Sequence, residues 1–341
     1  MLAANPQIDH ANMPSPQSEI ERYFRSGEHD PLFAAWPGGN MVKCARRGDA
    51  DLRRALVAEV KARTATVSVP EALIDLDCEA FARAKVAPMV RGVFPIVEQP
   101  VALEMLARSL VFLTPSTIEA VLNRGFPSTA WDLANLYLLS CGAEPLADDA
   151  PRIVGMSEDT TCFVSMDYFR ANHRFADFVV HEPAHVFHNC KRRTLGLPAT
   201  RRREWPLEIA FGKRETFAYA CEAYSRILEL GDSVLARRRL YQELEREAPP
   251  PDELVCHQEY VDILAQLYAP ETAGRSSSQR AHHRERVARD PRMIRYDAAV
   301  TFVRGSRELS LSGDTGESAI SFPCPRAISP HRRRSTAPWQ R

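Results

Sequence analysis

Apolar residues recur at helical spacing along most of the chain. Leu52, Leu56 and Val60 follow one another at intervals of four, with charged residues between them, so the pattern predicts an amphipathic helix from Asp49 onward. It also predicts a buried helix over residues 99–113 and further helices over residues 70–85, 117–125, 128–140, 174–189, 207–230, 232–247 and 252–268.

The hydrophobic period changes between residues 151 and 170. Arg152–Met156 and Thr161–Met166 are short runs of strand-forming residues, and the polar residues 157–160 between them are typical of a hairpin turn. The pattern therefore predicts an α+β protein that is predominantly helical, with one small β-hairpin just before the helix of residues 174–189.

Composition divides the chain into four regions. Residues 1–44 are rich in Pro, Asn and Gln, and we expect a poorly ordered leader there. An N-terminal helical region over residues 45–150 is expected to pack against a core over residues 151–270. Residues 271–341 carry 14 Arg against seven acidic residues, which predicts a basic, largely disordered tail.

Charge and cysteine content narrow the class of protein. The 341 residues have a formal net charge of 0, so no global field draws the chain toward nucleic acid or acidic lipid. No run of apolar residues is long enough to cross a membrane, and no secretory signal is apparent near the start. The eight cysteines form no closely spaced pair. These features predict a reduced, cytoplasmic protein that makes no membrane contact.

The segment of residues 178–189 carries the most informative chemistry. His181 and His185 are four residues apart, so on a helix both imidazoles face one side and can bind one Zn²⁺. Glu182 lies beside the first histidine, where a carboxylate takes a proton from the water at the metal and later returns it to the leaving amine. This HExxH spacing is the pattern of zinc-dependent proteases.

On these residues the chain resembles the zincin superfamily of zinc metallopeptidases. The resemblance covers the segment from Thr161 to about Glu215. It implies a zincin-like core in which the strand before the motif helix forms a rim where a peptide lies extended, and Thr161–Met166 has that place in the sequence. It also implies a third metal ligand outside the motif.

Three glutamates compete for the position of third ligand. The metzincin pattern of a further histidine is broken here, whereas the gluzincin type takes a glutamate from a following helix. Glu208, Glu215 and Glu222 are seven residues apart and share one helical face. We predict Glu215, because the small Ala218 one turn later lets two helices approach closely, and Glu222 is the second candidate.

Three other residues near the motif each have a chemical and a structural interpretation. His188 is a further ligand or oxyanion donor, or a helix-end histidine bonded to backbone carbonyls. Tyr219 is the predicted catalytic donor to the oxyanion, or else a core residue with a satisfied hydroxyl. Asp177 orients a ligand imidazole, or else is a solvated helix residue.

Pro183 departs from the pattern of an uninterrupted motif helix. Inside a helix, proline removes one backbone hydrogen bond at a cost of ~3 kcal/mol or more, and it disfavours helical geometry at the residue before it. Either the helix starts near His181, so that Pro183 falls in its first turn, or the motif helix is kinked.

The residues together predict a zinc-dependent peptidase that acts on a peptide or protein substrate. Zn²⁺ is expected to be held by His181, His185 and Glu215, with Glu182 as general base. Pro183 motivates a first alternative, a zinc-binding regulatory protein without turnover. The Arg-rich loop that follows the motif, together with the basic tail, motivates a second alternative, in which the chain contacts nucleic acid.

Overall fold

The computed structural model describes residues 15–170, 174–190, 192–197 and 210–268. Over these residues the chain is mostly helical and has one small sheet, which confirms the predicted predominantly helical α+β class. The predicted basic tail and most of the Arg-rich loop lie outside the described residues. None of the described helices combines the length and the apolar character that a membrane span needs.

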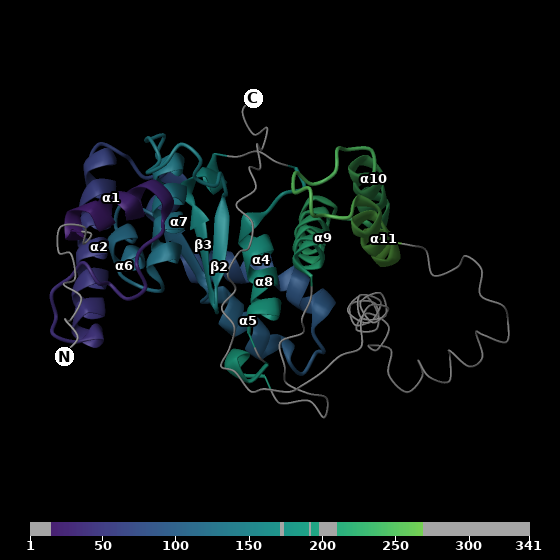
Figure 1. The fold of residues 1–341 in the computed structure, drawn as a ribbon. Helices are drawn as coiled ribbons and strands as arrows, with labels where there is room; N and C mark the ends of the chain where they lie inside the picture. Colours follow the sequence, from purple (N-terminus) through teal and green to yellow (C-terminus); the bar gives the residue numbers. More distant parts are fainter. Residues whose placement is uncertain (1–14, 171–173, 191, 198–209, 269–341) are drawn as a thin grey trace, which may run out of the picture.

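The N-terminal helices pack together beside the sheet. Helix α2 (Met41–Arg63) buries Leu52, Leu56 and Val60 completely, which confirms the predicted amphipathic helix. A single hydrophobic cluster joins α2 to the sheet and to three further helices, α1 (Pro16–Ser26), α6 (Ile118–Leu122) and α7 (Pro127–Ser140). In Figure 1 these four helices lie together on one side of the strands.

The predicted leader is wrong over its described part. Residues 16–26 form α1, and the Ser15 and Ser18 side chains cap its first turn reciprocally. Tyr23 is fully buried and donates its hydroxyl to the Pro127 carbonyl at 2.5 Å. The polar composition of this segment does not indicate the short helix, because tertiary packing stabilises it.

Three helices follow α2 along the chain: α3 (Glu71–Ile74), α4 (Cys78–Val93) and α5 (Gln99–Ala107). The prediction of one helix over residues 70–85 is therefore wrong. The Asp77 side chain accepts a hydrogen bond from the Ala80 N–H and begins α4 as a separate helix.

The sheet has three strands in the order β1-β3-β2: β1 (Leu110–Leu113), β2 (Gly155–Glu158) and β3 (Thr161–Ser165). Strands β2 and β3 form the predicted antiparallel hairpin. Strand β1 pairs in parallel with β3, so the predicted helix over residues 99–113 is wrong at its C-terminal end. An apolar run without a clear period is compatible with either a buried helix or a buried strand. Residues 110–113 form a strand because β3 provides a parallel partner for them.

Strand β3 is central and is hydrogen-bonded on both sides, so the prediction that Thr161–Met166 forms a peptide-binding rim is wrong. Among the described residues the open edge beside α8 belongs to β2. The Ser165 N–H donates to the Val154 carbonyl, so Gly155 and Ser157 occupy the alternate, non-hydrogen-bonded positions. Their backbone N–H and C=O groups therefore point away from β3.

Four helices complete the described fold: α8 (Phe178–Asn189), α9 (Phe211–Leu230), α10 (Val234–Leu244) and α11 (His257–Tyr268). Helix α8 packs against β2, β3, α4 and α9. Helices α10 and α11 cover the far side of α9 (Figure 1). Two 3₁₀ helices lie at Met166–Phe169 and Arg192–Leu195. The histidine motif therefore lies between the sheet and α9.

Pro183 lies in the interior of α8. The helix begins at Phe178, with the Asp177 side chain accepting from the Val179 N–H, so Pro183 is its sixth residue. The possibility that Pro183 falls in a first turn starting near His181 is therefore excluded. The Val179 carbonyl lacks the N–H that a helical residue 183 would normally donate.

We expect Pro183→Ala to stabilise the protein. The variant restores one helical hydrogen bond without adding a bulky side chain, and the gain should be about 1 kcal/mol or more. Urea denaturation of the two proteins measures it. An unchanged or lower free energy of unfolding would show that packing of the proline ring offsets the missing bond.

Candidate metal centre

Three side chains from two helices converge at the interface of α8 and α9. His181 and His185 extend from successive turns of α8, and Glu215 extends from the first half of α9. The two Nε2 atoms are 3.1 Å apart. His181 Nε2 lies 3.5 Å from one Glu215 carboxylate oxygen, and His185 Nε2 lies 3.5 Å from the other. The structure thus brings together the three residues predicted as metal ligands.

The separations between these ligand atoms are small enough for the three residues to hold one metal ion. Bonds of 2.0–2.1 Å at tetrahedral angles put neighbouring ligand atoms about 3.3 Å apart. Within this metal triangle of His181, His185 and Glu215, the two Nε2 atoms are 3.1 Å apart, and each lies 3.5 Å from a different Glu215 oxygen. With one ligand atom per residue, the three atoms lie within 4.8 Å of one another, so the three side chains are close enough to share one metal ion. Three protein ligands leave a fourth position free, as in catalytic rather than structural zinc sites.

Glu222, the second candidate for third ligand, instead contacts the other face of a ligand. Its Oε2 lies 3.1 Å from His181 Nδ1, and its side chain is only 2% exposed. In the neutral ring, donation from Nδ1 to this carboxylate leaves Nε2 as the acceptor that faces Glu215 and His185. Glu222 therefore orients the His181 ring and favours that tautomer when the ring is neutral.

Burial opposes a charged His181, yet hydrogen bonds from its ring to Glu215 and Glu222 outweigh burial and raise the pKa of His181 well above its ordinary value. The ring of Tyr219 packs at right angles against the same imidazole, with centroids 4.6 Å apart. Burial raises the pKa of Tyr219, so its hydroxyl keeps its proton. The predicted role of that hydroxyl toward an oxyanion stays a prediction.

Glu182 is buried beside the three candidate ligands and has no fixed partner. Within the described part of the chain its carboxylate forms no hydrogen bond or ion pair. Burial raises the pKa of Glu182 to about 7, a rise that His181 opposes and that Glu215 and Glu222 reinforce. A carboxyl group with a pKa near neutrality can both accept and return a proton.

Gly155 makes the space that Glu182 occupies, a role that the sequence pattern did not reveal. A Cβ atom at position 155 would lie 2.6 Å from Glu182 Oε1 and 2.7 Å from its Cγ. Two places along β2, the Ser157 hydroxyl accepts a hydrogen bond from Asn189 at 3.2 Å. Strand β2 thus runs along α8, and Gly155, the one glycine of the strand, lies against Glu182.

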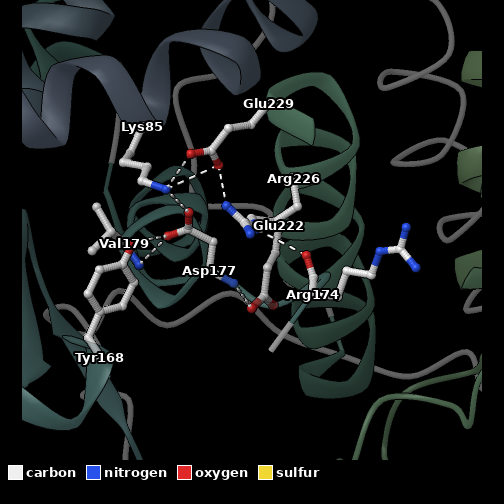
Figure 2. Close-up of polar contacts among 8 residues, drawn as sticks. All are labelled: Lys85, Tyr168, Arg174, Asp177, Val179, Glu222, Arg226 and Glu229. Atoms are coloured by element: carbon white, nitrogen blue, oxygen red, sulfur yellow. Dashed lines mark hydrogen bonds and ion pairs between the residues drawn. The ribbon is translucent and has the colours of Figure 1, made fainter. Parts of the chain in front are cut away.

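Asp177 is not a solvated helix residue, and it does not touch an imidazole directly. Its side chain is 2% exposed and lies 3.0 Å from Lys85 Nζ. Its backbone N–H donates to the Glu222 carboxylate (Figure 2). The other oxygen of Glu222 contacts His181 Nδ1, so Asp177 is linked to that imidazole through Glu222. Arg226, one turn after Glu222 on α9, forms an ion pair with Glu229.

The remaining candidates fall outside what the structure describes. Glu208 and most of the Arg-rich loop lie in the range 198–209. His188 belongs to α8, but the position of its side chain is not among the described features.

No protein-family model matches the chain, and neither a curated protein nor a solved structure matches it. Its function is therefore inferred from the site itself.

We expect Gly155→Ala to lower the free energy of unfolding by about 1–3 kcal/mol, because the added methyl group overlaps the Glu182 side chain. The same substitution in a Glu182→Ala background should cost much less, since the clash is gone. Urea denaturation of the four proteins of this cycle separates the two cases. Equal costs in both backgrounds would show that Glu182 is not the neighbour that requires glycine.

We expect the rise in Tm on adding zinc to grow between pH 6 and pH 8. The raised pKa of His181 means that the metal-free site binds a proton, which stabilises the folded chain below pH 6.5 and is lost as the pH rises through the folded pKa. Zinc competes with that proton, so it binds better as the pH rises. Calorimetry with and without zinc measures the effect, with His185→Ala as control. A zinc effect that shrinks with pH would contradict this prediction.

Proposed function

We propose that this chain is a zinc-dependent peptidase of the zincin type. His181, His185 and Glu215 would hold the metal, and Glu182 would serve as general base. The observation that carries the proposal is the convergence of two imidazole nitrogens and one carboxylate within 4.8 Å of one another, with the buried Glu182 carboxylate beside them. When bound, zinc supplies the Lewis acid that polarises water and the scissile carbonyl.

The chain's own groups account for the proton movements of hydrolysis. The Glu182 carboxylate accepts the proton of the attacking water and later donates it to the leaving amine nitrogen. A pKa of about 7 supports both halves of this cycle at neutral pH. His181 keeps its orientation through Glu222, and the protonated hydroxyl of Tyr219 is available to donate to the oxyanion.

The open edge of β2 supports a peptide or protein as the substrate. Extended peptides bind to sheet edges by backbone hydrogen bonds. The N–H and C=O groups of Gly155 and Ser157 point away from β3, have no backbone partner among the described residues, and offer such bonds. Gly155 also lies against Glu182, so a peptide paired there would pass close to the general base. His185 keeps 13% of its side chain exposed, so the metal triangle has access to solvent.

We expect Glu182→Gln to keep about one zinc per chain and to lose hydrolysis by 10²-fold or more, because the amide fills the same space but cannot take a proton. Elemental analysis measures the zinc, and cleavage of a mixed peptide library followed by mass spectrometry measures turnover. His185→Ala is the matched control that should lose both zinc and cleavage.

Each other outcome selects a different function. Full hydrolysis by Glu182→Gln would falsify the assignment of the general base. Wild-type protein that binds zinc but cleaves no peptide would favour the regulatory zinc protein that Pro183 suggests. Wild-type protein without zinc after supplementation would remove the metal site and the peptidase together.

A further inference from the structure

An ion pair with a buried carboxylate lies next to Glu222, the glutamate that contacts His181 Nδ1. Lys85 from α4 places its Nζ 3.0 Å from the Asp177 carboxylate at the start of α8. The same carboxylate accepts hydrogen bonds from the Tyr168 hydroxyl at 3.1 Å and from the Val179 N–H at 3.2 Å (Figure 2). These three contacts fix the first turn of α8 from three directions.

The backbone of Asp177 connects the start of α8 to the candidate metal site. Its N–H donates to Glu222 Oε1, and the other oxygen of Glu222 contacts His181 Nδ1. A continuous chain of contacts therefore runs from Lys85 through Asp177 and Glu222 to a ligand imidazole. It joins α4, α8 and α9, the helices that meet around the triangle.

The outer end of this chain is exposed. Glu229 lies two turns after Glu222 on α9, has 44% of its side chain exposed, and contacts Lys85 Nζ at 2.9 Å. The Lys85 side chain is 17% exposed. Lys85 thus bridges an exposed carboxylate on α9, that of Glu229, and the almost completely buried carboxylate of Asp177.

We propose that Lys85 is a positioning residue for the metal site, although it touches none of the three ligands. It holds Asp177, whose N–H holds Glu222, which in turn aims His181 Nε2 into the triangle. The proposal rests on the metal site proposed above and extends it to a cation nearly a hundred residues earlier in the sequence. Loss of Lys85 should loosen the ring of His181 before it affects His185 or Glu215.

The test measures zinc affinity rather than activity, by competition with a chromogenic chelator. Changing the groups that support metal ligands typically weakens metal binding by 10- to 100-fold. We expect Lys85→Met to weaken zinc binding by about tenfold, at the lower end of that range. Lys85→Arg should restore most of the affinity. Glu229→Gln, at the exposed end, is the matched control and should leave zinc affinity within about twofold of the wild type.

A second background separates positioning from general destabilisation. If Lys85 acts through Glu222, Lys85→Met should weaken zinc binding no further in a Glu222→Gln protein. The visible spectrum of the cobalt-substituted protein provides an independent readout, because its bands report the ligand geometry. Lys85→Met should change these bands, and Glu229→Gln should not.

Lys85→Met leaves the Asp177 carboxylate buried without its cation, so a variant that still folds is needed. Lys85→Met with Asp177→Asn removes the charge and keeps both the helix cap and the backbone N–H. This double variant should fold and still bind zinc more weakly than the wild-type protein. Two results would overturn the role of Lys85 while leaving the zinc site intact. One is wild-type zinc affinity in the folded double variant. The other is a loss of zinc affinity on Lys85→Met that is equal in the wild-type and Glu222→Gln backgrounds. A wild-type protein that binds no zinc overturns both proposals.

Discussion

Burial of charge between α8 and α9 is the constraint on which the rest of the site depends. Glu182, Glu215 and Glu222 are all buried. The carboxylates of Glu215 and Glu222 lie 3.5 and 3.1 Å from nitrogens of the His181 ring, and Glu182 is the next residue along α8. Carboxylates out of water are costly unless a cation, a proton or a hydrogen-bond donor faces them. The His181 ring faces two of these carboxylates directly. Glu182 instead has a raised pKa, which reduces the charge that is buried at neutral pH. A divalent cation at the triangle would relieve the repulsion, which is why metal and fold are coupled in our proposal.

The parts of the fold that depend on local periodicity could be predicted from the sequence. Leu52, Leu56 and Val60 predict α2 because a helix with one apolar face needs no distant partner to be recognised. Leu110–Leu113 could not be assigned in this way, since its strand pairs with residues about fifty positions later. The hidden helix α1 shows the same limit, because its buried Tyr23 contacts the start of α7.

The candidate site was predictable where one helix carries it and ambiguous where two helices meet. The spacing of His181 and His185 predicts that they share a face. Glu215 and Glu222 are two turns apart on one face, and only the packing of α9 on α8 decides which carboxylate meets Nε2 and which meets Nδ1. Gly155 contributes the absence of a side chain, which no motif of reactive residues reveals.

The parallel pairing of β1 with β3 distinguishes the parts of the site that form locally from those that need segments far apart in the sequence. Contacts between segments far apart in sequence close slowly, because the intervening chain must first lose its freedom. His181 and His185 meet within a single helix, so they are neighbours as soon as α8 forms. Gly155 reaches Glu182 only once the hairpin is docked on α8, and the hairpin is completed by β1. The two histidines are therefore placed by α8 alone, whereas Glu215 and the enclosure of Glu182 depend on α9 and the hairpin docking onto that helix.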